Sequence, residues 1–208
     1  MLLSDDPDRY YHLAVSQHWR WREGLFVQSF PNVEGLGWGN FFPDKEPFFH
    51  VLTGIAYFLK SSFGVFLVPV FAALALLLVL VVLVSDSRRL WIESGIFLSL
   101  GILGQSYFLN RISMLRPHTI ALVLFFLLWF CFEKTKKVWI FLVSALFALS
   151  YHAIYLPLAL ALVDGVTRWQ SKREWNLVFY KPGWFCVLGL ALGTAISPSF
   201  PGNILMSL

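Results

Sequence analysis

Long apolar stretches follow a polar N-terminal segment, residues 1–47. The stretches cover 63–84, 90–109, 117–132, 137–166 and 183–197. Because a helix that crosses a bilayer needs about 20 apolar residues, the first two are long enough for a span and the third and last are short. The run 137–166 fits either one long tilted helix or two short ones.

Basic residues between the stretches decide between these two alternatives. Nine of them are Arg88, Arg89, Lys134, Lys136, Lys137, Arg168, Lys172, Arg173 and Lys181. Membrane proteins keep such residues on the cytoplasmic side. If 137–166 crossed once, 167–182 would lie on the opposite side from 133–137. Two crossings, with a turn near Tyr151 and His152, place all nine inside. We therefore predict an all-α polytopic membrane protein with about six transmembrane helices.

This threading assigns the remaining segments to the outer side of the membrane. They are 1–47, the 110–116 loop, the 151–152 turn and 198–208. The apolar segment Phe48–Leu59 is too short to span and fits an interfacial or re-entrant helix. We expect two parts: an extracytoplasmic acidic loop with interfacial helices over 1–62, and a transmembrane domain over 63–208.

Composition agrees with a membrane protein. The 208 residues are 58% hydrophobic and 13% charged, whereas a soluble domain is about a quarter charged. These values exclude a disordered chain, a basic DNA-binding domain and a disulfide-stapled secreted module. Cytoplasmic basic residues explain the net charge of +4 without nucleic acid. We expect Cys131 and Cys186 to be buried thiols near the cytoplasmic ends of their helices.

The chain begins with a cluster of acidic residues, S-D-D-P-D-R-Y-Y-H-L-A at 4–14. Asp6 is a good N-cap, Pro7 suits the first helical position, and Asp8 favours the positive end of the helix dipole. One face of this predicted interfacial helix carries Tyr10, Leu13, Ala14, Gln17 and Trp21. Helix capping alone accounts for these carboxylates.

The same residues also suit a metal ion. Asp8 and His12 are one helical turn apart and can face the same point. Clustered oxygen ligands suit Mg²⁺ or Mn²⁺, which neutralise a phosphate leaving group. Capping and metal binding both remain open from the residues alone.

Two stretches resemble a known superfamily. D-P-D-R-Y-Y-H-L at 6–13 resembles the first outer-loop acidic motif of the GT-C membrane glycosyltransferases. The oligosaccharyltransferase pattern of Asp, one residue, then Tyr-Tyr-His-Leu matches the segment from Asp8 to Leu13. The start of the aminoarabinose and O-mannosyl transferases, Asp-Glu-x-Arg-Tyr, matches Asp6, Arg9 and Tyr10. F-P-D-K-E-P-F-F-H-V-L at 42–52 is similar to the loop and Pro-led helix before their second span.

The resemblance implies roles for several of these residues. Asp8 and Asp6 would be catalytic carboxylates or metal ligands, with His12 as a further ligand of Mg²⁺ or Mn²⁺. Tyr10 and Tyr11 would contact substrate. The superfamily's first membrane helix and, in oligosaccharyltransferases, a large soluble domain with Trp-Trp-Asp have no counterpart here. We therefore expect the chain to be a fragment of a longer protein.

Polar residues at the other outer loops fit the same picture. Arg111 and Arg116 lie in N-R-I-S-M-L-R-P-H and are either snorkelling to lipid headgroups or holding the phosphate of a polyprenyl carrier. His152 lies between Tyr151 and Tyr155 and either belongs to an aromatic belt or contacts substrate.

The resemblance predicts an enzyme of the bacterial or archaeal cell membrane. It would transfer a sugar or oligosaccharide from a polyprenyl-phosphate or -diphosphate donor to an acceptor on the extracytoplasmic face. The alternative is a non-enzymatic transporter or assembly protein. A transporter typically carries ionisable residues at mid-membrane, and the apolar stretches here are almost free of charge. The pattern therefore favours the enzyme.

Overall fold

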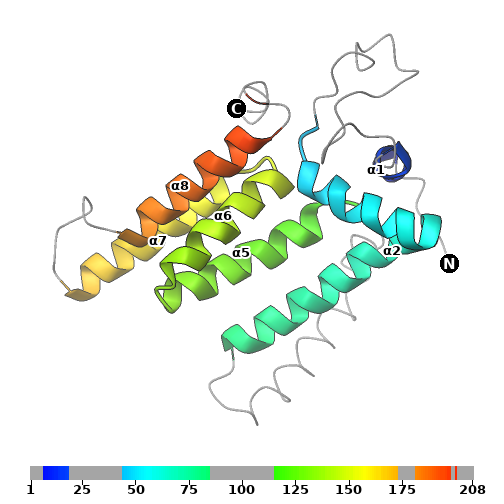
Figure 1. The fold of residues 1–208 in the computed structure, drawn as a ribbon. Helices are drawn as coiled ribbons and strands as arrows, with labels where there is room; N and C mark the ends of the chain where they lie inside the picture. The colour runs from blue at the N-terminus through cyan, green and yellow to red at the C-terminus, as the bar shows by residue number, and fades with distance from the viewer. Residues whose placement is uncertain (1–6, 19–43, 85–114, 173–180, 198–199, 201–208) are drawn as a thin grey trace. The chain divides into compact units, whose positions relative to one another are not determined.

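The computed structural model describes residues 7–18, 44–84, 115–172, 181–197 and 200, and its regular structure in these ranges is helical (Figure 1). The helices are α1 (Pro7–His18), α2 (Pro47–Val84), α5 (His118–Glu133), α6 (Lys137–Ser150), α7 (Tyr155–Lys172) and α8 (Lys181–Ile196). The all-α prediction is confirmed for this part of the chain. The predicted span 90–109 lies outside it.

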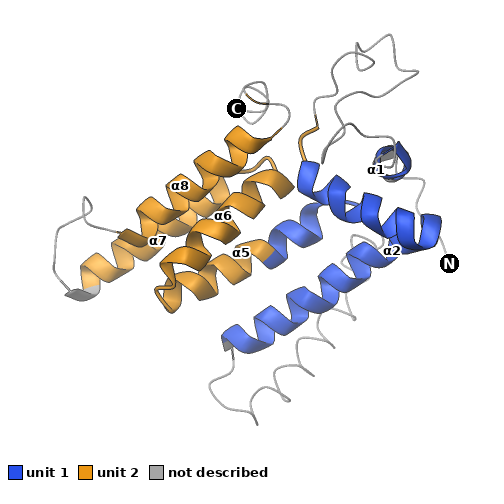
Figure 2. Ribbon diagram, in the orientation of Figure 1, with its two compact units in different colours: residues 1–42, 47–123 blue, residues 43–46, 124–208 orange. Residues whose placement is uncertain are grey.

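The chain divides into two compact units (Figure 2). Unit 1 comprises residues 1–42 and 47–123, and unit 2 comprises 43–46 and 124–208. The predicted boundary at residue 62 separates two sides of a membrane rather than two packed bodies, and it stays a prediction.

In unit 1, α1 packs on α2, and both helices begin at the prolines that the sequence indicates, Pro7 and Pro47. Proline is favoured at the first helical position because the N–H it lacks has no partner there. On α1 the buried side chains are His12, Val15 and Ser16, which recur at helical spacing. The face predicted from Tyr10 and Gln17 is the outer one, since both side chains are exposed.

α2 consists of two helical segments joined by a sharp bend (Figure 1). The backbone leaves the helical region at Lys60 and Ser61, and Ser61 has a φ of 56°. After the bend the chain returns so closely that a Cβ on Gly64 would lie 2.2 Å from the carbonyl oxygen of Ala56. The bend falls between the two apolar segments that the sequence separates, 48–59 and 63–84.

α2 is also the helix of the described ranges that is long and apolar enough to cross a membrane. Only 22% of its most apolar window is buried. The core helix of a soluble protein would be mostly covered by its neighbours, so this exposure favours a lipid environment. α5, α6 and α8 are shorter apolar helices.

In unit 2, tight turns separate α5 from α6 and α6 from α7. α5 ends in a Schellman motif: Thr135 has a φ of 51°, its N–H donates to the Phe132 carbonyl, and the Lys136 N–H donates to Cys131. The run 137–166 is broken at 151–154, as two short helices require. α7 continues past the apolar run to Lys172, because Asp164 and Arg168 pair one helical turn apart and extend it into polar sequence.

α6 and α8 run parallel in close contact. A Cβ on Gly189 would lie 2.3 Å from the Phe141 carbonyl oxygen, and one on Gly193 would lie 2.3 Å from that of Ala145. Glycines four residues apart let two helix backbones approach closely, which is common in membrane helices. At the same contact the Ser144 hydroxyl donates to Cys186 Sγ at 3.3 Å, and both Cys131 and Cys186 are buried and free, as predicted.

The Lys and Arg residues described in the helices α5 to α8 and in the turn between α5 and α6 gather at one end of these helices. Arg168 Nη2 donates to the Phe132 carbonyl oxygen at 2.6 Å, which joins the end of α7 to the end of α5. Lys136 and Lys137 follow at the next turn. Because α8 runs parallel to α6, Lys181 at its start belongs to the same end.

Candidate functional site

A pair of buried histidines joins α1 to α2 in unit 1. His12 is 4% exposed and His50 is 1% exposed. His12 Nδ1 and His50 Nε2 are 2.9 Å apart, although the two residues are 38 positions apart in sequence. This separation is a hydrogen bond between the rings.

The hydrogen bond constrains the protons of the pair. One of the two facing nitrogens carries a proton and the other accepts it. The accepting imidazole is therefore neutral, and the pair holds at most one positive charge. The other nitrogen of each ring, His12 Nε2 or His50 Nδ1, takes no part in this hydrogen bond.

Aromatic rings and hydroxyls hold the two imidazoles in place. Tyr11 contacts the edges of both, with ring centroids 4.9 Å from His12 and 5.8 Å from His50. Phe49 packs against His12 at 5.0 Å. The Ser16 hydroxyl donates to the His12 carbonyl oxygen and is fully buried, so even this polar group is satisfied within α1.

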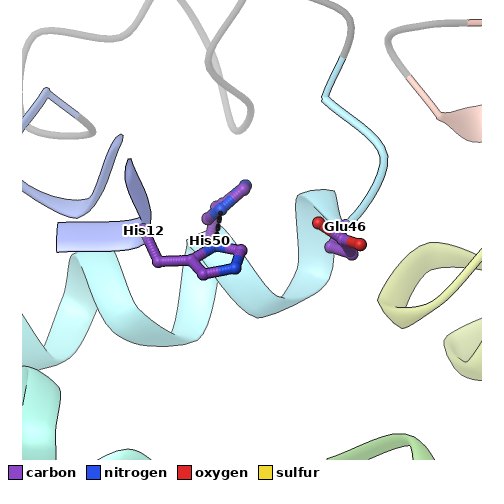
Figure 3. Close-up of side chains that lie close together, drawn as sticks. All are labelled: His12, Glu46 and His50. Carbon is purple, nitrogen blue, oxygen red and sulfur yellow. Dashed lines mark hydrogen bonds between the residues drawn. The ribbon is translucent and has the colours of Figure 1, made fainter. Parts of the chain in front are cut away.

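Glu46 brings a carboxylate to the same place. It immediately precedes Pro47, the first residue of α2, so helix geometry puts it one turn before His50. One ligand atom from each of His12, Glu46 and His50 lies within 4.8 Å of the others (Figure 3). The Glu46 side chain is 12% exposed. The three side chains together are a candidate metal centre.

The donor atoms decide which metal ion fits. Mg²⁺ takes oxygen ligands and Mn²⁺ also favours them, whereas imidazole nitrogen suits zinc, copper, iron and nickel. Two imidazoles and one carboxylate are a ligand set typical of catalytic zinc sites. The described donors therefore fit Zn²⁺ better than the expected Mg²⁺.

The residues that the sequence singles out are placed as follows. Asp6 and Arg111 lie outside the described residues, and Asp8 is described as a backbone position in the first turn of α1. Tyr10 is exposed, whereas Tyr11 is half-buried against the histidine pair. Arg116 is half-buried just before α5, which begins at His118. Of the predicted metal ligands, His12 belongs to the cluster.

His152 has an acidic neighbour within unit 2. Its Nδ1 lies 3.6 Å from the Glu46 carboxylate, at the turn between α6 and α7. The Glu46 N–H donates to the Asp44 carboxylate at 3.0 Å, which fixes the chain just before α2. At the same turn, burial raises the pKa of the Tyr151 phenol, and the nearby charges of Tyr155 and Glu46 raise it further.

Sequence reasoning missed His50 and Glu46 as candidate metal ligands. Both lie in the second family-like stretch, 42–52, which the resemblance predicts to be a loop followed by a Pro-led helix. A usable signal was present: Glu46 and His50 are four residues apart, so they share one helix face, and each type of side chain binds metals. Their partner His12 lies in a separate helix, and no local spacing relates it to them.

Comparison with known proteins adds no relative to this description. No protein-family model matches the chain, and the comparisons with characterised proteins and with solved structures found no match.

Proposed function

We propose that this chain belongs to a membrane glycosyltransferase of the GT-C type. The enzyme would transfer a sugar or oligosaccharide from a polyprenyl-phosphate or -diphosphate donor on the extracytoplasmic face. One observation carries the proposal: the two family-like stretches, 6–13 and 42–52, meet through the buried contact between His12 and His50. A loop that merely capped a helix would not need its histidine buried against a second motif.

The proposal assigns roles to the residues of the first stretch. Asp8 and Asp6 hold a divalent cation or orient the acceptor nucleophile, and Tyr10 and Tyr11 contact substrate. Tyr10 suits this role because its ring is exposed on the outer face of α1. A bound cation supplies charge stabilisation for the departing phosphate of the donor.

Arg111, Arg116 and His152 complete the proposed assignment. The two arginines bind the donor phosphate, since a guanidinium pairs with phosphate through two parallel hydrogen bonds. His152 contacts donor or acceptor. Arg116 lies two residues before the N-terminus of α5, where free N–H groups also favour an anion.

The proposal includes six membrane crossings. Three features of unit 2 support it: the break at 151–154, the gathering of basic residues at one end, and outward-facing apolar side chains. Those large exposed side chains include Trp139, Leu162, Val163, Trp184 and Leu188. Exposed apolar surface of this extent is typical of contact with lipid.

The transferase is tested with the intact protein in proteoliposomes, supplied with polyprenyl-phosphate and polyprenyl-diphosphate sugars. We expect Asp8→Asn and Asp6→Asn to abolish transfer at unchanged expression, because loss of a cap costs only about 1 kcal/mol. Glu133→Gln, at the exposed end of α5, is the matched control and should transfer normally. Transfer at wild-type rate in both Asp variants contradicts the proposal.

The threading is tested by cysteine labelling from each side of sealed vesicles. Lys136→Cys should react with an impermeant reagent from the cytoplasmic side and His152→Cys from the outer side. The two native cysteines are buried and give a low background. Labelling of both positions from one side would rule out the separate crossing by α6.

A further inference from the structure

We infer that His12, His50 and Glu46 bind a zinc ion. The inference goes beyond the proposed glycosyl transfer and does not depend on it, since the three ligands would join α1 to α2 through the ion whatever reaction the protein catalyses. It also differs from the expected site, in which Asp8 and Asp6 bind Mg²⁺ or Mn²⁺ through oxygen.

The distance between the two imidazoles already approximates a metal site. Bonds of 2.0–2.1 Å in a tetrahedral zinc centre separate two ligand nitrogens by about 3.3 Å. His12 Nδ1 and His50 Nε2 are 2.9 Å apart, so the ion requires the two nitrogens to separate by a few tenths of an ångström and both rings to turn until their lone pairs meet at the ion. The ion takes the place of the proton that the two nitrogens share, and that proton moves to the other nitrogen of the ring that carried it, so that both imidazoles bind the ion in the neutral form.

Glu46 supplies the third ligand by a small side-chain movement. A carboxylate oxygen of Glu46 lies within 4.8 Å of one ring nitrogen of each histidine and must approach by up to about 1.5 Å for the tetrahedral spacing. The side chain has rotatable bonds and starts one turn before His50, so this movement leaves the backbone of α2 in place. A fourth position remains for water or substrate, as in catalytic zinc sites.

The surroundings favour an ion over an isolated hydrogen bond. Val15, Phe49 and Thr53 are fully buried around the pair and keep water from the imidazoles. A carboxylate beside two imidazoles gives the bound ion a compensating negative charge.

The experiment measures zinc binding by the intact protein in detergent after chelation and desalting. Isothermal titration with Zn²⁺ should give one site per chain, with Mg²⁺ binding at least 100-fold more weakly. Removing a residue that only hydrogen-bonds to a metal ligand already lowers metal affinity 10–100-fold, and removing the ligand itself should lower it further. His12→Ala and His50→Ala should therefore each weaken Zn²⁺ binding about 100-fold or more, and Glu46→Gln about 10-fold. His118→Ala, at an exposed position of α5, is the matched control and should bind Zn²⁺ as the wild type does.

Folding is controlled independently of metal. His50→Gln keeps a hydrogen-bonding side chain of similar size, and its elution profile and metal-free unfolding midpoint show whether the variant is native. Substitution of Co²⁺ for zinc gives a visible spectrum that reports on ligand number and geometry. Wild-type Zn²⁺ affinity in a natively folded His50→Gln overturns the inference, as does a preference for Mg²⁺. Loss of binding in natively folded His50→Gln and Glu46→Gln supports it.

Discussion

The contact of α1 with α2 in unit 1 and the contact of α6 with α8 in unit 2 use opposite means. α6 and α8 meet where Gly189 and Gly193 remove side chains, so that backbone touches backbone. α1 and α2 meet through rings, with the His12–His50 pair at the centre. One contact depends on shape and the other on particular donor atoms.

Packing alone explains the contact between α6 and α8 but not the contact between α1 and α2. Two glycines facing a helix backbone are what close packing requires in lipid. Two buried imidazoles are costly, because each polar atom taken from water must find a partner. Apolar side chains of similar size would join α1 and α2 at less cost. The chemistry of the first contact therefore marks it as the candidate site.

The largest effect is expected at the glycine contact. Gly193→Leu adds a side chain whose Cβ would lie 2.3 Å from the Ala145 carbonyl oxygen, so α6 and α8 must separate. Overpacking of this kind costs about 3 kcal/mol or more. Thermal unfolding in detergent measures it, with Ala191→Leu on the exposed face of α8 as control. Equal midpoints for the two variants would show that α8 does not rely on close approach.

A smaller effect is expected at the histidine pair. His50→Leu leaves His12 Nδ1 buried without its hydrogen bond, which costs about 1–3 kcal/mol. Replacing both histidines by leucine removes the unsatisfied group, so the double variant should be more stable than either single one. Unfolding midpoints of the four proteins in a double-mutant cycle, all without metal, measure the coupling. Additive losses would contradict a direct hydrogen bond between the rings.

A still smaller effect is expected at Arg168, whose side chain joins α7 to the end of α5 and lies outside the candidate site. Its Nε lies 2.8 Å from Asp164, and both side chains are partly exposed, so Arg168→Ala should cost only about 1 kcal/mol in stability. The proposed sugar transfer and the inferred zinc binding should both stay unchanged. The same unfolding and binding assays measure all three quantities. A loss of zinc affinity in Arg168→Ala would contradict the claim that Arg168 supports only the packing of α7.

The smallest effect is expected for Ser144→Ala. The Ser144 hydroxyl donates to Cys186 Sγ, a weak acceptor, at 3.3 Å in the α6–α8 contact. Its removal should cost about 0.5 kcal/mol, at the lower end for a hydrogen bond. A loss in unfolding free energy as large as that of Gly193→Leu would show that this contact also depends on its donor atoms.

Much of the helix pattern follows from the sequence because its signals are local. Pro7 and Pro47 start helices, and the polar break around Lys60 divides two apolar runs. The positive-inside rule places a turn inside 137–166, and the chain breaks at 151–154. The end of α7 at Lys172 could not be predicted from the apolar run, which stops at residue 166. Its last turns are polar and are held by an ion pair instead of burial.

The site was less predictable because it is formed by distant residues. His12 follows from its motif as a candidate ligand, but the motif points to Asp8 as its partner. The packed face of α1 sets the actual neighbour, and that face includes His12 and Val15 rather than Tyr10. Hydropathy hardly distinguishes these faces, since both mix polar and apolar residues. The sequence likewise did not predict the roles of Gly189 and Gly193, because these depend on the packing of α8 against α6.

The bend at Ser61 has a consequence for where chemistry can occur. In a membrane, the segment after the bend, 62–84, is about 34 Å long and matches the hydrocarbon thickness. The helical segment before the bend runs in a different direction, and about 14 Å of helix separate the bend from His50. If this first segment lies along the membrane surface, the histidine pair lies at the level of the lipid headgroups, close to the place where the second segment enters the membrane. There, the histidine pair lies buried between its two helices at the boundary between water and lipid.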